Sequence, residues 1–344
     1  MPKRYYWPIL ALVALCPVSG CFVPMNGDTV EITAEDGPDD ERALSVVLTY
    51  DLDRIWSQDD GRARGLVVYS LGYTACTPSV SEFATLLASL GYVFAVPDHD
   101  DIYKICRAVS DSPSQENGKV SVGGEVVDAE ALAAYSSLEE EKLFSFEQLE
   151  NYFHYRNIDL SETIEHLTSN DTYEFGSLAD KPVFLVGYSL GGWNALMVAG
   201  ASRLYPDLTQ DVTAVICEAP YFGDLREECM KQVSCPVLYL VGTEDDFLPN
   251  VYQLSSWCPG SSCLVEIEGA NHYLFAADLC RSPVLSTLFL GSCTEESAVA
   301  GDKVNALMAE FILKMTVTPE LPALEGLETY DPELFNVVYR TAPE

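Results

Sequence analysis

The residues best suited to do chemistry are a serine and the glycines around it. Gly187-Tyr188-Ser189-Leu190-Gly191-Gly192 follows directly on the apolar run Val183–Val186 and precedes small residues at helical spacing. Gly-x-Ser-x-Gly between a strand and a helix is typical of a nucleophile elbow, a tight turn that exposes the serine hydroxyl. The glycines are needed because a side chain two residues from the serine would collide with neighbouring backbone. We predict that Ser189 is a nucleophile.

A serine hydroxyl attacks only with the help of a base, and the chain has four histidines. His272 follows the last apolar run, at 264–267, which places it at the same carboxyl edge of the predicted sheet as Ser189. His99, in Pro97-Asp98-His99-Asp100, is its rival. His154 and His166 lie in or beside predicted helices and have packing or surface roles in our interpretation. We predict that His272 is the base.

The third partner should be a carboxylate between the serine and the histidine in the chain, the order Ser, acid, His. Asp245 lies in the loop 242–249, after the predicted strand 236–241 that precedes the strand leading to His272. It is our candidate for the residue that orients the imidazole. Asp246 and Asp224 are the alternatives, and simple surface charge is the competing explanation for all three.

The elements that must position these residues alternate between strand and helix. Apolar runs predict strands at 43–50, 65–70, 92–96, 183–186, 212–217, 237–241 and 264–267. Helical spacing appears at 82–90, 160–167, 191–203 and 304–315, and a further helix is expected near 127–149. This pattern predicts an α/β protein with a mostly parallel sheet and helices on both faces. The polar stretch 100–150 interrupts the pattern and is expected to form an insertion over the site.

Together, Gly187–Gly192, Gly242–Pro249 and Gly269–His272 resemble the α/β-hydrolase superfamily. Residues 66–73 and 88–99 are similar, more narrowly, to esterases of the dienelactone-hydrolase-like and platelet-activating-factor-acetylhydrolase-like groups. The resemblance covers 43–316. It implies an oxyanion hole formed by the backbone N–H groups of Leu190 and Tyr73, and a structural role for His99. Leu71-Gly72 stands where these relatives usually have His-Gly.

Such a site hydrolyses carboxylic esters through an acyl-enzyme, without a cofactor or a metal. The expected substrate is a small-molecule or lipid-like ester. Aromatic residues in the insertion could line an acyl pocket or pack the insertion onto the body, and Tyr221, Phe222 and Tyr273 are candidates for the pocket rim. Trp193 is expected in the core. The alternatives are a catalytically silent lipoprotein of the same fold, or an acyltransferase or peptidase with the same triad.

The N-terminal residues predict export. Lys3 and Arg4 precede an apolar run at 7–16 that is too short to span a bilayer, and Val18-Ser19-Gly20-Cys21 ends it. The segment resembles a bacterial lipoprotein signal, which implies cleavage after residue 20 and lipidation of Cys21. We therefore expect a signal at 1–20, a tether at 21–42, the catalytic domain at 43–316 and a C-terminal tail at 317–344. The expected location is the bacterial cell envelope, at the outer membrane or cell surface in a Gram-negative organism.

The charge balance excludes some partners. The 344 residues include 19 Lys and Arg against 53 Asp and Glu, which gives a formal net charge of −34. A field of this sign repels nucleic acids and disfavours electrostatic docking on anionic lipid. The membrane contact would therefore come from the acyl chains on Cys21. The oligomeric state is not predicted.

The cysteines fit an exported protein, because disulfides persist outside the cytosol. Nine of the eleven remain beyond residue 21. Short spacing suggests the pairs Cys229–Cys235, Cys258–Cys263 and Cys280–Cys293. Elimination then leaves Cys76–Cys106, with Cys217 unpaired in a buried strand. Spacing alone does not fix this connectivity.

Overall fold

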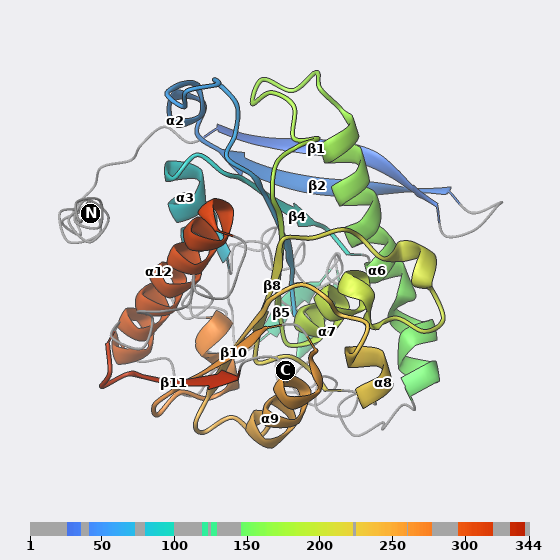
Figure 1. Ribbon diagram of the computed structural model, residues 1–344. Helices are drawn as coiled ribbons and strands as arrows, with labels where there is room; N and C mark the ends of the chain where they lie inside the picture. The colour runs from blue at the N-terminus through green and yellow to red at the C-terminus, as the bar shows by residue number, and fades with distance from the viewer. Residues whose placement is uncertain are drawn as a thin grey trace.

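A computed structural model of the chain was analysed (Figure 1). It describes residues 26–35, 41–72, 80–99, 119–122, 125–128, 146–222, 225–259, 261–276, 295–318 and 331–340. The predicted signal and Cys21 lie outside these residues, as do Tyr73 and Asp224. No helix in the described ranges is both long and apolar enough to cross a membrane.

A nine-stranded sheet forms the centre of the molecule. The strands lie in the order β1-β2-β4-β3-β7-β8-β9-β10-β11. Six neighbouring strands are parallel: β4 (Val93–Pro97), β3 (Leu66–Ser70), β7 (Val183–Tyr188), β8 (Ala214–Glu218), β9 (Val237–Gly242) and β10 (Ser262–Ile267). The remaining strands pair antiparallel with their neighbours: β1 (Asn26–Glu35) and β2 (Glu41–Tyr50) at one end of the sheet and β11 (Phe335–Arg340) at the other. The carboxyl ends of the parallel strands therefore share one edge.

Helices cover both faces of this sheet. One face packs against α6 (Phe146–Ser169), α7 (Leu190–Leu196), α8 (Glu227–Met230) and α9 (Leu248–Trp257). The other packs against α3 (Ser81–Ser89) and α12 (Glu295–Val317), which lie together in Figure 1. The short helix α2 (Leu52–Trp56) follows β2, and π-helical and 3₁₀ turns occupy Met197–Ala201, Pro206–Leu208 and His272–Ala276. The predicted α/β class and mostly parallel sheet are confirmed.

The two ends of the sheet depart from the sequence prediction. The expected tether at 21–42 contains β1, whose Val30 and Ile32 pair in register with Val46 and Leu44 of β2. Val30 and Ile32 alternate with polar residues, which is the pattern of a half-buried strand. At the other end, the C-terminal tail contributes β11, and its Phe335 is buried against the core. The described parts of both segments therefore belong to the fold.

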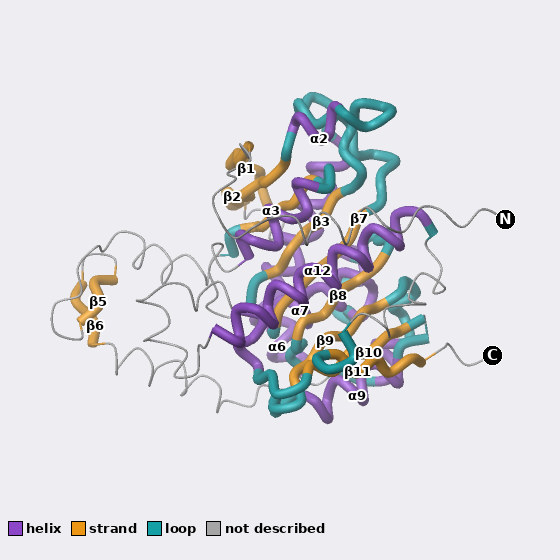
Figure 2. Tube along the Cα trace, turned by 90° about the vertical axis from the view of Figure 1, so that its left-hand side faces the viewer, coloured by secondary structure: helices purple, strands orange, loops and turns teal. Residues whose placement is uncertain are grey.

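The insertion also differs from expectation. Within 100–150 the structure describes β5 (Lys119–Val122) and β6 (Glu125–Asp128), which pair as an antiparallel hairpin. Figure 2 shows this hairpin to one side of the main sheet. Of the helix expected near 127–149, residues 127 and 128 lie in β6 instead, residues 146–149 lie in α6, and 129–145 lie outside the described residues.

Two of the predicted disulfides are absent. Neither the Cys229–Cys235 pair nor the Cys258–Cys263 pair is joined by a disulfide: Cys229 lies in α8 and Cys263 in β10, whereas Cys235 precedes β9 and Cys258 follows α9. Cys217 is a free thiol in β8, as predicted, and burial raises its pKa well above the usual value. The pairs Cys76–Cys106 and Cys280–Cys293 lie outside the described residues.

Candidate active site

Ser189 lies in a strained turn between β7 and α7. Its backbone has φ 53° and ψ −116°, a conformation that residues with a side chain seldom adopt. Neighbouring glycines make the turn possible. A Cβ at Gly187 would lie 2.2 Å from the carbonyl oxygen of Gly191, and a Cβ at Gly191 would lie 1.9 Å from that of Ser70. The glycines are thus required by close backbone contacts, as the sequence motif implied.

The fold brings Ser189, His272 and Asp245 together. His272 follows β10 at the start of the 3₁₀ turn, and its Nε2 lies 3.0 Å from Oγ of Ser189. Its Nδ1 lies 2.9 Å from Oδ2 of Asp245. The Asp245 side chain is 1% exposed and that of His272 is 23% exposed. A buried carboxylate at Nδ1 keeps the proton on that nitrogen, so Nε2 can accept the serine proton.

One backbone contact in the loop after β9 orients the carboxylate of Asp245. Oδ1 of Asp245 accepts a hydrogen bond of 2.8 Å from the backbone N–H of Phe247, which turns the carboxylate inward. Asp246 is exposed, and Asp224 lies outside the described residues. Asp245 is thus the acidic candidate that contacts His272.

The backbone of the elbow is held on both sides. The N–H of Ser189 donates to the carbonyl of Glu218 at 2.8 Å, and the carbonyl of Ser189 accepts from the N–H of Tyr221 at 2.8 Å. Leu190 is the first residue of α7, so its N–H has no carbonyl one turn earlier in that helix to bind. It is therefore available as an oxyanion donor. Tyr73, the second predicted donor, lies outside the described residues.

Aromatic rings surround His272. The ring centroids of Phe247, Tyr188 and Tyr273 lie 4.7, 5.1 and 5.9 Å from that of its imidazole. Tyr221 packs edge-on against Phe247 at 5.9 Å, and Tyr273 is 43% exposed. These residues give the site an apolar rim. The ring centroids of Phe222 and Trp257 lie 5.8 Å apart, and Trp193 is fully buried.

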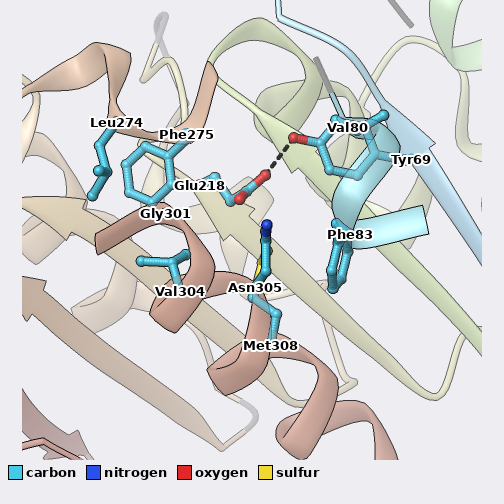
Figure 3. Close-up of a pocket in the computed structure, with 10 residues that line it drawn as sticks. All are labelled: Tyr69, Val80, Phe83, Glu218, Leu274, Phe275, Gly301, Val304, Asn305 and Met308. Carbon is cyan, nitrogen blue, oxygen red and sulfur yellow. Dashed lines mark hydrogen bonds between the residues drawn. The ribbon is translucent and has the colours of Figure 1, made fainter. Parts of the chain in front are cut away.

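A hollow lies beside the 3₁₀ turn that begins at His272. It is lined by residues of β3, α3, β8, α12 and the 3₁₀ turn, including Tyr69, Glu218, Phe275 and Asn305 (Figure 3). The buried Glu218 carboxylate accepts a hydrogen bond from the Tyr69 hydroxyl. None of Ser189, Asp245 and His272 lines this hollow. Sequence patterns missed this pair, because an acidic residue and a tyrosine at strand ends carry no signal of their own.

The other histidines have separate partners. His99 is fully buried between Ser70 and Asp159, with Nε2 3.2 Å from the Ser70 Oγ and Nδ1 2.7 Å from the Asp159 Oδ2. His154 stacks on Tyr205, and Nε2 of His166 lies 3.0 Å from the Tyr173 hydroxyl. No cluster of three or more metal-ligating side chains occurs within the described ranges.

Comparisons with known proteins bear on the fold. No protein-family model matches the chain, and no curated protein matches it. Among solved structures it is similar to a ferulic acid esterase from Streptomyces cinnamoneus, with a TM-score of 0.60 and 18% identity. The match covers 95% of this chain and 98% of the esterase. This chain therefore shares the α/β fold of that esterase over nearly its whole length.

Proposed function

We propose that the protein is a serine hydrolase that cleaves carboxylic esters through Ser189, His272 and Asp245. The observation that carries the proposal is the continuous contact from the Ser189 hydroxyl to the buried Asp245, with both links at 3.0 Å or less. The strained backbone of Ser189 supports it, because such strain persists only where the surroundings enforce it and is common at active sites. The fold shared with a ferulic acid esterase agrees with it.

The reaction begins with proton transfer to the base. Nε2 of His272 takes the Ser189 proton as Oγ attacks the ester carbonyl carbon, and Asp245 stabilises the imidazolium that forms. The carbonyl oxygen becomes an oxyanion, to which Leu190 and Tyr73 donate their N–H groups in this proposal. One such donor contributes about 10²–10³ in kcat in comparable sites.

The second half of the reaction releases the acyl group. The tetrahedral intermediate collapses, the C–O bond to the alcohol breaks, and the leaving alkoxide takes the proton from His272. Water then attacks the acyl-enzyme with the same base, and the acid leaves as Ser189 regains its proton. These steps are complete without a cofactor.

The decisive experiment compares Ser189→Ala with Ser256→Ala, a matched change at an exposed serine of α9. With a short-chain p-nitrophenyl ester, kcat of the first variant should fall by at least about 10⁴-fold, and that of the second should stay at the wild-type value. A fluorophosphonate probe should label the wild type and not Ser189→Ala. Undiminished hydrolysis by Ser189→Ala would exclude the proposal, and failure of the wild type to react with the probe would favour a silent protein.

The aromatic rim favours an aromatic acyl or alcohol group in the substrate. The rings of Phe247 and Tyr273 lie against His272, and Tyr221 packs on Phe247. Aromatic pairs contribute about 0.5–1.5 kcal/mol beyond area burial. The solved structural neighbour is named for an aromatic acid. A panel of hydroxycinnamate, benzoate, aliphatic and phospholipid esters, with amides and an alcohol acceptor added, tests this preference. A higher kcat/KM for aliphatic esters would exclude it.

We also infer that the protein is exported and held at a membrane by lipid on Cys21. The support is the sequence Val18-Ser19-Gly20-Cys21 after a basic start and a short apolar run. Mass spectrometry of the mature N-terminus and membrane fractionation of Cys21→Ala test this inference. Release of the variant into the soluble fraction is expected, whereas an unmodified Cys21 in a processed wild type would exclude lipidation.

A further inference from the structure

A buried arginine contacts the segment that follows β3. Arg156 of α6 is fully buried, and its Nη1 donates to the carbonyl oxygen of Leu71 at 2.7 Å. Its Nη2 donates to the carbonyl oxygen of Gly72 at 3.5 Å. Burying a guanidinium is costly unless it is well hydrogen bonded. An apolar side chain could fill the same space without that cost, so we look to the two hydrogen bonds for the role of Arg156.

A buried chain of polar groups also holds Ser70, the last residue of β3. Ser70, His99 and Asp159 have no exposed surface, and Asp159 lies one turn after Arg156 in α6. With the His99 proton on Nδ1, toward Asp159, the Ser70 hydroxyl donates to Nε2. Helix α6 therefore holds Ser70 through His99 and holds Leu71 and Gly72 directly.

The opposite side of the same segment packs on the nucleophile elbow. A Cβ at Gly191 would lie 1.9 Å from the Ser70 carbonyl oxygen and 2.7 Å from that of Leu71. A Cβ at Gly72 would lie 2.7 Å from the ring of Tyr188, the residue before the nucleophile. Residues 70–72 are thus held between the elbow and α6, with no space for an added methyl group at either glycine.

We propose that Arg156 and the chain Ser70–His99–Asp159 are positioning residues, which fix the oxyanion side of the site by holding residues 70–72 against the elbow. Gly191 packs directly on the carbonyls of Ser70 and Leu71 and adjoins Leu190, the proposed oxyanion donor. The position of residues 70–72 therefore affects the position of that N–H. This inference rests on the proposed serine hydrolase function.

The Ser70–His99–Asp159 chain has the residue types of a catalytic triad, but it is not a second active site. Its serine hydroxyl and both side-chain partners have no exposed surface. A substrate carbonyl has no access to the Ser70 Oγ, so the chain acts through the backbone it holds.

The test uses Arg156→Met, Arg156→Lys and Ser70→Ala, with Thr163→Val as the control. Thr163 is a buried residue of α6 whose hydroxyl has no hydrogen-bond partner, and valine matches its shape. Competent sites are counted by complete labelling with a fluorophosphonate, and kcat is expressed per labelled site. A boronic acid that forms a tetrahedral adduct with the nucleophile reports on the oxyanion side independently of turnover.

Arg156→Met should lower kcat per site by at least about tenfold, and KM should change less than about threefold. The loss should be smaller than the roughly 10²–10³-fold loss that follows complete removal of one oxyanion donor. The boronate dissociation constant should rise in parallel, and Arg156→Lys should recover part of both losses because its ammonium can still bind one carbonyl. Thr163→Val should match the wild type.

The proposal is overturned if Arg156→Met and Ser70→Ala keep kcat per site and boronate affinity within about threefold of the wild type. It is also overturned if Thr163→Val loses as much as they do, because the effect would then be general destabilisation. Should Arg156→Met not fold, Ser70→Ala decides the matter, since it removes only one hydroxyl. An inactive wild type would instead refute the proposed function.

Discussion

Replacing Asp245 by Asn is the sharpest test of the proposed Ser189–His272–Asp245 triad. The substitution keeps the shape of the side chain and removes only its charge and one hydrogen-bond acceptor. In the structure both carboxylate oxygens accept hydrogen bonds, Oδ1 from the Phe247 N–H and Oδ2 from His272. An asparagine has one carbonyl oxygen, and the Phe247 N–H requires it. The side-chain NH₂ must then face His272 Nδ1 and donate to it.

That donation forces the histidine into the wrong tautomer. With Nδ1 as an acceptor, the ring proton moves to Nε2 and points at the Ser189 hydroxyl, 3.0 Å away. Nε2 can no longer accept the serine proton. Asparagine at this place in a serine-protease triad lowers kcat by about 10⁴, which equals about 5 kcal/mol of transition-state stabilisation at about 1.36 kcal/mol per tenfold. We expect a loss of the same order here.

The assay is kcat/KM for a short-chain p-nitrophenyl ester at pH 7–8, with thermal unfolding measured alongside. Asp246→Asn is the matched control, since it makes the same chemical change at the adjacent, exposed residue. It should change kcat/KM less than about twofold. If Asp245→Asn keeps more than a tenth of the wild-type activity while folded, or if Asp246→Asn loses as much, the assignment of the acid is wrong.

Three further predictions concern stability. Ser189→Gly should raise the free energy of unfolding by about 1 kcal/mol, because relief of about 1–3 kcal/mol of backbone strain exceeds the added chain entropy of glycine, about 0.5–1 kcal/mol; a lower urea midpoint would contradict this. Gly191→Ala should destabilise by more than about 3 kcal/mol, because its Cβ would lie 1.9 Å from the Ser70 carbonyl oxygen, and circular dichroism checks it. The hydrogen bond from Lys181 lowers the pKa of Asp60 to about 2. The stabilisation of the fold by this ion pair is therefore present above the unfolded pKa of Asp60, near 3.9, and is lost as pH falls through the folded pKa of about 2. Lys181→Met should cost less than about 1 kcal/mol at pH 6 and nothing below pH 2, so an equal loss at both pH values would refute the linkage.

The deficit of positive charge is reflected in how carboxylates are partnered. Tyr50 donates to Asp28, Tyr69 to the buried Glu218 and Tyr252 to the nearly buried Glu266. Burial and the neighbouring Asp28 raise the pKa of Tyr50 well above its usual value, so its hydroxyl keeps its proton in alkaline solution as well as at neutral pH. With few Lys and Arg available, tyrosine hydroxyls supply these donors. The composition gave no indication of these pairs, because they join residues far apart in the sequence.

Local chemistry explains what the sequence predicted well. The elbow is a strand, a turn and a helix within a few residues. The contact that excludes a Cβ at Gly187 lies inside that unit, whereas the contact that excludes one at Gly191 is with Ser70 of β3. The parallel strands are continuous apolar runs because they are buried on both faces. The order of the strands along the chain then places His272 at the same sheet edge as Ser189.

Long-range contact explains what the sequence missed. Strands β1 and β11 exist only because β2 and β10 offer them a partner, and their acidic or proline-containing surroundings suggested a tether and a tail. Likewise, Cys229 and Cys258 are close in sequence to their expected partners, but a disulfide requires Cα atoms within about 7 Å and suitable Cβ directions. Sequence separation does not determine that geometry.

The sequence by itself determined the nucleophile motif, the fold class and the region of the chain in which the acid should lie. Only the tertiary structure chose Asp245 over its neighbour Asp246, because that choice depends on which carboxylate meets both the Phe247 N–H and His272. It alone placed His99 between Ser70 and Asp159, and Arg156 at the segment beside the elbow. The contacts of Asp245 with His272, of His99 with its two partners and of Arg156 with Leu71 join residues 27 to 85 positions apart, which spacing along the chain does not encode.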